Sequence, residues 1–355
     1  MWIADLLRMM RNDKSHREFH RAAVKTVFFL IAPFLLASCS KKQVHNFSGI
    51  AIGTYYSVTY VGKEDLSLPE AADSIIASIN RDFSIFDSTS TVSRLNANTT
   101  AILPDDIIHL ICLSNHISEE TGGAFDITIG PLVNAMGFGK NSDFDTLSYQ
   151  QQMDSLQHFV GYQKISVANG KLKKEDSRIQ LDFNAIAKGY AVDKIAKMMQ
   201  EKGYENFLVD IGGEVLAQGW KYEGQEWRVG VQIPTETQNG LIETNYIFEL
   251  PLKSGLNCVA TSGNYRNYKE INGKRYSHII NPVTGNSENS SLLSVSVIAK
   301  DCASADAYAT AFMVLGIEKS MAILQNHNEL AAHFIYYENG NFQYKQTSNF
   351  PKSIQ

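Results

Sequence analysis

Residues 181–193 read LDFNAIAKGYAVD and hold the densest group of structural signals in the chain. From Ile179 to Phe183 apolar and polar side chains alternate, which predicts a β-strand. Asn184 offers a side-chain oxygen for a helix N-cap, and apolar residues then recur at helical spacing until Gly203, a typical residue just beyond a helix end. We therefore expect a strand, a tight turn and a helix.

The first turn of this helix would contain Lys188 and Gly189. The exposed N–H groups of such a turn favour an anion, and phosphate is the usual one. Lys188 would add a mobile cation, and Gly189 would let a ligand approach the backbone. The plainer interpretation is an ordinary strand-to-helix connection, and one short motif does not separate the two.

The N-terminal residues have the pattern of an export signal. Several basic residues precede or enter the apolar run 22–38, AAVKTVFFLIAPFLLAS, which is too short and too interrupted for a comfortable membrane span. The following sequence, LASC at 36–39, resembles a bacterial lipobox and implies lipid attachment to Cys39; the alternative is a plain signal peptide. We expect a signal peptide over 1–38, a lipidated tether over 39–46 and a folded domain over 47–350, anchored in the cell envelope and facing the periplasm.

Charge and cysteine usage narrow the function class. The net charge of -5 gives no support for nucleic-acid binding. Cys112 lies in the apolar run 107–113 and is interpreted as a small core residue. Cys258 and Cys302 flank two of the motifs below; a disulfide between them is compatible with the sequence, but spacing does not establish it.

Several polar residues stand in segments that otherwise look buried. Asp126 lies in an apolar run and must find donors or a cation, because an unpaired buried carboxylate is costly. Asp306 and Thr310 are four residues apart on one helix face, and their oxygens suit a hard divalent cation. The alternative for Asp306 is an aspartate stabilised by the helix dipole. His278 alone is more often a structural residue than a catalyst.

Strand and helix signals alternate without a regular βαβ period. This predicts an α+β fold with largely antiparallel sheets and helices in two intertwined halves, and a ligand cleft between the halves. The polar stretch 86–96 is a binding loop or a solvated connection, and 141–178 a connection with a short helix and a hairpin. Helices are expected over 69–83, 107–121 and 302–315, and strands over 55–61, 207–215, 227–231 and 291–299, with a polar turn over 235–245.

Six motifs occur in order: IGT (52–54), GAFDITIGPLVNAMGFG (123–139), LDFNAIAKGYAVD, VDIGGEV (209–215), ATSGNYRNY with YSHIINPVTG (260–285), and ADAYATAFMVLG (305–316). Together they resemble the ApbE family, the FAD:protein FMN transferases, from about residue 47 to the C-terminus. The resemblance implies a Mg²⁺-dependent enzyme that uses FAD as its substrate. It would transfer FMN to a threonine or serine of an exported or membrane flavoprotein and release AMP. Lipidated, exported members are familiar in that family.

The resemblance also implies the site. Asp306 and Thr310 would bind Mg²⁺ with the carbonyl of Ala185, and either His278 or Asp306 would remove the acceptor proton. The FAD-binding residues would be Ile52, Thr91, Val92, Ser93, Asp126, Lys188, His278 and Ile280. Ile52 replaces the methionine of many members, and we expect no loss of binding because the contact is apolar. Two other functions keep the same motifs: an FAD pyrophosphatase and a non-catalytic flavin-binding lipoprotein.

Overall fold

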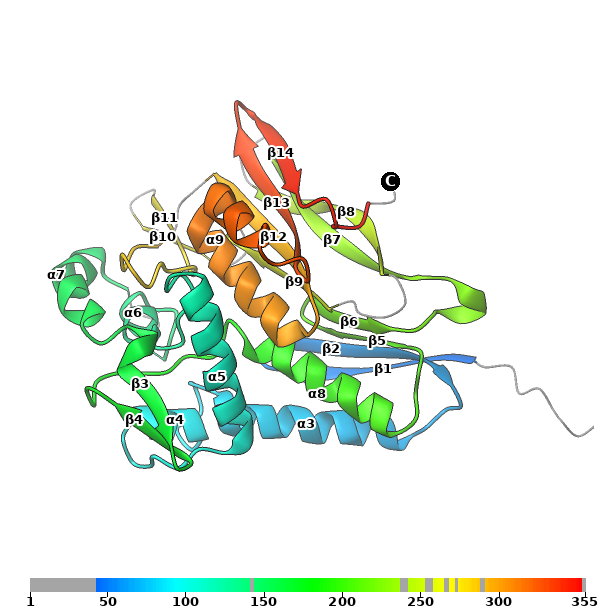
Figure 1. Cartoon of the computed structure of the whole chain (residues 1–355), viewed down its shortest axis with the longest axis horizontal. Coiled ribbons are helices and arrows are strands. Elements are labelled where there is room, and N and C mark those ends of the chain that lie inside the picture. The colour runs from blue at the N-terminus through cyan, green and yellow to red at the C-terminus, as the bar shows by residue number, and fades with distance from the viewer. Residues whose placement is uncertain are drawn as a thin grey trace, which may run out of the picture. The chain divides into compact units, whose positions relative to one another are not determined.

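An eight-stranded antiparallel sheet forms the centre of the folded body, in the order β1-β2-β5-β6-β9-β12-β13-β14 (Figure 1). The computed structural model describes residues 43–140, 144–236, 242–252, 258–264, 268–271, 274–287 and 291–352. The predicted signal peptide and Cys39 lie outside these residues. Strand β1 begins at Gln43, so the folded body begins four residues before the predicted boundary at 47.

The bounds of the elements are as follows. The helices are α3 Ser67–Phe83, α4 Thr91–Asn96, α5 Asp105–Glu120, α6 Gly130–Ala135, α7 Thr146–Gln157, η1 Tyr162–Lys164, α8 Ala187–Glu201, η2 Tyr222–Gly224 and α9 Cys302–Leu324. The strands are β1 Gln43–Ala51, β2 Thr54–Gly62, β3 Ile165–Ala168, β4 Lys171–Lys174, β5 Phe207–Ile211, β6 Glu214–Gln218, β7 Trp227–Glu236, β8 Ile242–Leu252, β9 Cys258–Gly263, β10 Tyr268–Ile271, β11 Lys274–Ser277, β12 Leu292–Ala299, β13 Ala331–Glu338 and β14 Asn341–Gln346.

The two faces of the sheet are covered differently. Helices α3, α8 and α9 pack on one face and bury the larger core (Figure 1). The β7–β8 hairpin contributes Trp227 and Leu252 to a smaller core with Val215 and Val259 on the other face. Because neighbouring residues of a strand point to opposite faces, Cys258 and Glu214, next to Val259 and Val215, point toward the helices. The predicted α+β fold is confirmed.

Most long elements agree with the periodicity of the sequence. Helix α5 ends before Gly122 and Gly123, which both have positive φ, and Gly203 follows α8 with φ 84°. The expected short helix and hairpin within 141–178 are α7 and the pair β3–β4. Helix α9 runs well beyond the predicted end at 315, with a non-helical residue, Gly316, inside it.

The first part of the opening motif differs from the prediction. Residues 179–183 form no regular strand; a single bridge joins Gln180 to Ile129, and the Asn96 side chain bonds to the Leu181 backbone. Asn184 is not the N-cap of α8. The capping position is Ile186, with no side-chain cap, while the N–H of Asn184 donates to Asp182.

Three further predictions are corrected. Cys112 is exposed rather than buried, because α5 turns Leu110, Ile111 and Ser114 inward and Cys112 away from the core. The polar stretch 86–96 contains a helix, α4, with Ser90 as its N-cap. Strands β7 and β8 extend into the predicted turn at 235–245, of which 237–241 lie outside the described residues.

Helix α9 is a core helix that packs closely against α8. By length and composition it is the only helix among the described residues that could cross a membrane. Its first half, however, is almost entirely buried, and the small residues Ala303, Ala307 and Ala311 lie within it. A Cβ on Gly189 would stand 2.1 Å from the carbonyl oxygen of Cys302. Gly189 therefore lets the backbone of α9 approach α8. The sequence had instead indicated that it lets a ligand approach.

We predict that Gly189→Ala destabilises the protein by about 3 kcal/mol, because the clash is with backbone that cannot move away cheaply. Helix propensity alone predicts the opposite sign, since alanine favours a helix interior by about 1 kcal/mol over glycine. Urea unfolding at equilibrium measures the difference.

Lys197→Ala on the same helix is the matched control, because the Lys197 side chain is exposed. It should change the unfolding free energy by less than about 0.5 kcal/mol. A Gly189→Ala protein that is as stable as the wild type would contradict the close packing of α8 and α9.

Candidate active site

Two buried carboxylates and one half-buried lysine lie where α8, α9 and β6 meet. Lys188 forms an ion pair with Glu214, and the N–H of Gly189 donates to Asp306 Oδ2 over 3.2 Å. Glu214 and Asp306 are only 2% and 3% exposed. Burial raises the pKa of both carboxyls, and Asp306 raises that of Glu214 further, while Lys188 opposes these effects. Three elements thus hold two acids and one ammonium in one interior region.

This region suits a divalent cation. Glu214 Oε2 is buried and has no hydrogen-bond partner, although the other oxygen of the same carboxylate contacts Lys188. Such an atom loses its hydration without compensation, at a cost of about 1–3 kcal/mol. Asp306 and Glu214 repel each other electrostatically. An ion that prefers oxygen ligands would relieve both costs, so the donor set fits Mg²⁺.

The other two predicted metal-binding residues lie beside this cluster. Thr310 is on α9, one turn after Asp306, and its hydroxyl lies 3.0 Å from that of Ser262 on β9. Ala185 is half-buried in the turn before α8. The Gly189–Asp306 hydrogen bond ties the start of that helix to α9. The sequence elements that carry the three predicted ligands are therefore neighbours in the fold.

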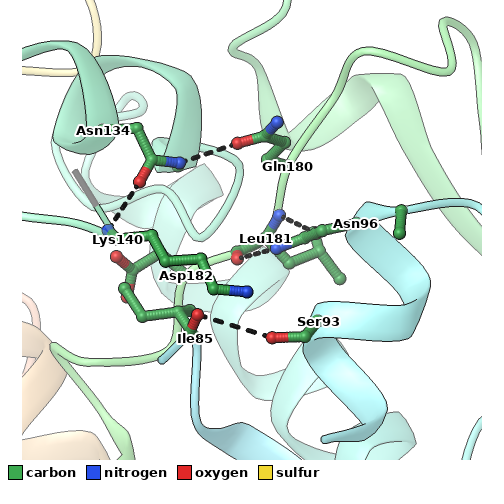
Figure 2. Close-up of a pocket in the computed structure, with 10 residues that line it drawn as sticks. Ile85, Ser93, Asn96, Asn134, Lys140, Gln180, Leu181 and Asp182 are labelled. Atoms are coloured by element: carbon green, nitrogen blue, oxygen red, sulfur yellow. Dashed lines mark hydrogen bonds between the residues drawn. The ribbon is translucent and has the colours of Figure 1, made fainter. Parts of the chain in front are cut away.

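A cavity of about 240 Å³ opens at the other end of the opening motif (Figure 2). Its walls come from α4, α6 and the extended residues 180–182. Asn96 clamps Leu181 through two hydrogen bonds of 2.7 and 2.9 Å, and Asn134 donates to the Gln180 side chain. The lining residues are Ile85, Ser93, Asn96, Ala97, Gly130, Asn134, Lys140, Gln180, Leu181 and Asp182. The cavity offers amide, hydroxyl and charged groups to a ligand.

Two buried carboxyls belong to the segments that meet here. Asp182 lies in the cavity wall, and Asp126 is one residue before Ile127, which accepts the backbone N–H of Asp182. Asp126, 6% exposed, accepts hydrogen bonds of 2.7 Å from the backbone and hydroxyl of Thr128 and from the backbone of Tyr162. Burial still raises its pKa. Asp182 lines the cavity, and its backbone N–H donates to Ile127; burial raises the pKa of its carboxyl to about 6. The donors that Asp126 was expected to need are thus supplied by the protein.

The stretch 91–93 forms the first turn of α4. The hydroxyl of Thr91 donates to Asp82, and Val92 is fully buried. Ser93 lines the cavity, and its hydroxyl donates to the carbonyls of Ser84 and Ile85 at 3.3 and 3.4 Å. Of these three predicted FAD-binding residues, Ser93 has its side chain at the cavity wall.

Ile52 occupies a strained position at the tip of the β1–β2 hairpin. Its φ is 47°, which is rare for a β-branched residue, and Gly53 follows with φ 74°. Thr54 packs against Gly212, where an added Cβ would stand 2.8 Å from it. The IGT motif therefore meets the glycine pair that precedes Glu214. Backbone strain of this kind is often found at functional sites, so it agrees with a role for Ile52.

His278 and Ile280 lie on the side of α6. The ring of His278 packs edge-on against Phe138, with 6.3 Å between ring centroids. Ile280 is 4% exposed and packs in a small apolar cluster with Leu132 and Met136. Phe138 is two residues from Lys140, which lines the cavity. His278 is thus linked to the cavity wall through Phe138 and the short segment that leads to Lys140.

Sequence reasoning gave no role to Glu214 on β6 or to Asp193 on α8, although both interact with the first turns of α9. Asp193 accepts hydrogen bonds from the N–H groups of Cys302 and Ala303, at 2.8 and 2.9 Å. Burial raises its pKa to about 7. Both residues carried a signal in the sequence, because each is a charged residue within an apolar, glycine-containing motif.

We predict that Lys188→Met lowers the unfolding free energy by about 3 kcal/mol at neutral pH, because it leaves Glu214 buried without its ammonium partner. Adding Glu214→Gln should recover at least half of the loss, since the uncompensated charge is then gone. Equilibrium urea unfolding of the single and double variants measures this. Removing the exposed Lys197–Glu201 pair is the control and should cost about 0.5 kcal/mol or less. A double variant no more stable than Lys188→Met would contradict the pairing.

Asp182 gives a prediction on pH dependence. Its pKa is about 6 in the folded protein against an ordinary 3.8, so the folded state keeps the proton longer than the unfolded chain. This contribution to stability is present at low pH and is lost as the pH rises through about 6. Asp182→Asn should therefore gain up to about 3 kcal/mol over the wild type above pH 6, and less near pH 4.

The control for this measurement is Asp176→Asn. Hydrogen bonds from Arg178 lower the pKa of the Asp176 carboxyl to about 2, so above about pH 5 this group is ionised in both the folded and the unfolded chain, and the variant should not change the slope of stability between about pH 5 and 6. If the unfolding free energies of the wild type and Asp182→Asn change in parallel with pH over this range, the raised pKa of Asp182 is contradicted.

Comparisons with known proteins agree on one family. Residues 52–334 match the ApbE family. Relatives named FAD:protein FMN transferase from Vibrio cholerae serotype O1 and Haemophilus influenzae are each 32% identical, over 90% and 89% of this chain and 96% and 94% of the relatives. The flavin transferase ApbE from Vibrio cholerae has a similar structure (TM-score 0.77, 30% identity, 87% of this chain and 98% of that chain). So does the apo form of the Pseudomonas stutzeri flavinyl transferase ApbE (TM-score 0.77, 33% identity, 88% and 96%). This chain therefore belongs to the ApbE family.

Proposed function

We propose that this protein transfers FMN from FAD to a threonine or serine side chain of an acceptor protein and releases AMP. The name shared by the relatives, FAD:protein FMN transferase, supports the reaction. The observation that carries the proposal is the cluster of the buried Glu214 and Asp306 with the half-buried Lys188, in which one carboxylate oxygen has no hydrogen-bond partner. Phosphoryl transfer depends mainly on positioning and on neutralising charge, and this cluster can provide both.

Asp306, Thr310 and the carbonyl of Ala185 would hold Mg²⁺. When bound, the ion would withdraw electron density from phosphate oxygens and help the AMP group to leave. Asp306 is kept in place by the N–H of Gly189 and by the charge of Lys188, and Thr310 by the hydroxyl of Ser262. The ligands are thus positioned by contacts within the protein, which reduces the reorganisation needed to bind the ion.

FAD would extend from the cavity toward the acidic cluster. Ser93, Asp126 and Lys188 supply polar contacts on this path, Ile52 supplies an apolar one, and Thr91 and Val92 shape the turn that carries Ser93. Residues 181–193 run from the cavity, at Leu181 and Asp182, to the acidic cluster, at Lys188 and Gly189. This continuity supports one extended ligand rather than two separate sites.

His278 and Ile280 would complete the site beside α6, and His278 is the better candidate to remove the acceptor proton. Asp306 already accepts a hydrogen bond and would bind the cation, so it has less freedom to act as a base. His278 packs against Phe138, which is two residues before Lys140 in the cavity wall. A group that accepts the proton must come within hydrogen-bond reach of the acceptor hydroxyl.

The protein would act at the cell envelope. The signal peptide over 1–38 and lipidation of Cys39 would anchor the folded body to a membrane and face it to the periplasm, where exported flavoproteins fold. The negative net charge gives no support for a nucleic-acid partner.

The test incubates the full-length protein in detergent with FAD, MgCl₂ and a threonine-bearing flavoprotein acceptor, and weighs the acceptor by mass spectrometry. We expect an increase equal to one FMN, which disappears with EDTA. Asp306→Asn should slow the reaction by about 100-fold, because it removes the charged ligand of the cation. Glu318→Gln, on the same helix beyond Gly316, should leave the rate unchanged.

Other products would point to another function. Consumption of FAD to FMN and AMP with an unlabelled acceptor would favour a pyrophosphatase in which water replaces the hydroxyl. Intact FAD that binds tightly without turnover, across a panel of acceptors, would favour a flavin-binding lipoprotein.

A further inference from the structure

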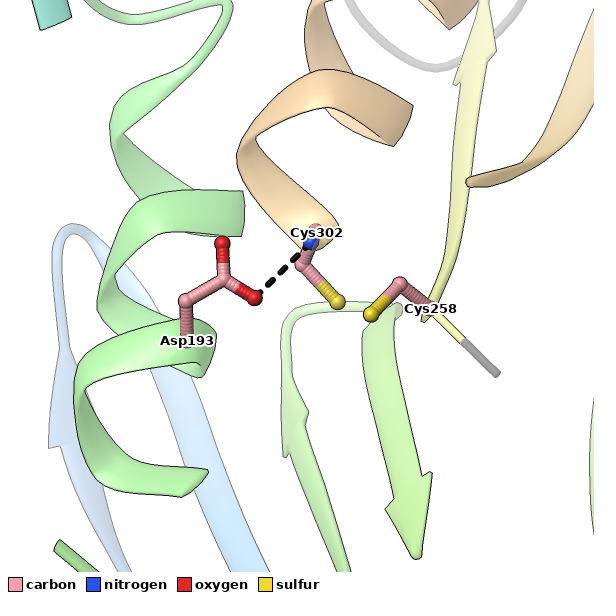
Figure 3. Close-up of side chains that lie close together, drawn as sticks. All are labelled: Asp193, Cys258 and Cys302. Carbon is pink, nitrogen blue, oxygen red and sulfur yellow. Dashed lines mark hydrogen bonds between the residues drawn. The ribbon is translucent and has the colours of Figure 1, made fainter. Parts of the chain in front are cut away.

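Two buried thiols face each other between β9 and α9, one turn from the predicted cation ligand. The side chains of Cys258 and Cys302 are both fully buried, and their sulfur atoms point toward one another (Figure 3). The two sulfurs and a carboxylate oxygen of Asp193 all lie within 4.8 Å of one another. Both cysteines are free thiols in this structure. A disulfide bond is about 2.0 Å long, so the two side chains must turn further toward each other for the bond to form.

Strand β9 places Cys258 and a second residue that contacts α9 on the same face of the sheet. Cys258 and Ser262 are four residues apart on one strand, so both point to the face that α9 covers. Ser262 contacts Thr310 through its hydroxyl, and Cys258 lies against Cys302 at the start of the helix. Strand and helix therefore meet at two polar points, and Asp306 lies between them on the helix.

We propose that Cys258 and Cys302 form a disulfide that fastens the start of α9 to β9. The oxidant would be a disulfide, either on a protein or in a small molecule. One cysteine thiolate attacks it and forms a mixed disulfide, and the second thiolate then displaces the remaining thiol. In total the two cysteines lose two protons and two electrons, and the oxidant is reduced to two thiols.

The observations favour a disulfide over a bound soft metal such as zinc. Both oxygens of Asp193 already accept N–H groups from Cys302 and Ala303, so this carboxylate has a structural partner. A closed zinc site requires four ligands, and among the described residues the cluster holds three. The thiol of Cys302 also lies 3.2 Å from the carbonyl of Val215 in a fully buried position. Two neighbouring sulfurs without a full set of four metal ligands are better suited to a disulfide than to a closed zinc site.

The burial of the two thiols determines at which stage of folding the disulfide can form. It raises the pKa of the Cys302 thiol, so little thiolate is present in the folded protein. The disulfide would therefore form before α9 docks on β9, and would then be shielded from reductants. An exported protein meets disulfide oxidants during folding, which agrees with the proposed location.

The consequence for the site rests on the proposed function. Asp306 follows Cys302 by one turn, so a covalent bond at Cys302 would restrict the motion of the helix segment that presents the cation ligand. We expect the oxidised protein to bind Mg²⁺ more tightly than the reduced protein. Formation of the disulfide itself does not depend on whether FMN is transferred.

The experiment refolds the full-length protein from urea in detergent with reduced and oxidised glutathione, blocks free thiols, and maps tryptic peptides by mass spectrometry. We expect a cross-linked pair formed by residues 254–266 and 301–319, with Cys112 outside it. Reduction should lower Tm by about 5 °C or more in the wild type and not in Cys258→Ser. Blocked thiols at both positions after oxidative refolding would overturn the proposal, as would stoichiometric zinc that is lost in Cys258→Ser and Cys302→Ser.

A second measurement tests the effect on the cation site without using activity. The rise in Tm with increasing MgCl₂ reports binding to the folded state. We expect the Mg²⁺ concentration needed for a given rise to increase about tenfold on reduction of the wild type, and to be insensitive to reductant in Cys258→Ser. Equal Mg²⁺ dependence in oxidised and reduced wild type would overturn the positioning role. If the cross-link forms but no FMN is transferred, the proposed function fails and the disulfide stands.

Discussion

The close contact between the starts of α8 and α9 is the interaction on which the site depends. The missing Cβ of Gly189 lets the carbonyl of Cys302 approach, and Asp193 from α8 binds the first N–H groups of α9. In return, Asp306 of α9 accepts the N–H of Gly189 near the start of α8. Each helix therefore satisfies backbone donors of the other, which would otherwise be buried without partners.

This arrangement concentrates negative charge in the interior. Asp193, Glu214 and Asp306 all have raised pKa values, chiefly because they are buried, and Lys188 is the cation paired with Glu214. Desolvation of this kind lowers stability unless a partner compensates for it. A bound cation would compensate and would stabilise the folded state by mass action. Stability and function are therefore linked here, because the buried carboxylates that destabilise the protein without a cation are the groups that attract the cation.

Local signals predicted the long elements well and failed where a partner distant in the sequence decides the structure. Helix α5 and its glycine end, the hairpin β3–β4 and the position of Gly203 follow from periodicity and turn chemistry. Asn184 was a reasonable cap in sequence, but Asp306, more than a hundred residues away, takes a donor at the start of that helix. The role of Glu214 likewise depends on the register of β6 and on its contact with Lys188 of α8, and the residues next to Glu214 in the sequence reveal neither. The six ordered motifs indicated which segments of the chain form the site. Which side chains contact one another within it depends on tertiary contacts that the sequence does not show.

The sheet gives this site its rigidity, because it fixes one part of the cluster while the helices fix the other. Glu214 is the first residue of β6, between β5 and β9 in the middle of the sheet, whereas Asp306 and Lys188 lie on helices that cover it. A sliding of helices over the sheet would therefore change the separation of the charged groups directly. Ser262 with Thr310, and Cys258 with Cys302, are both contacts between these same two layers. The geometry of the cluster is thus set by how firmly α9 is held on β9, more than by the conformation of any single side chain.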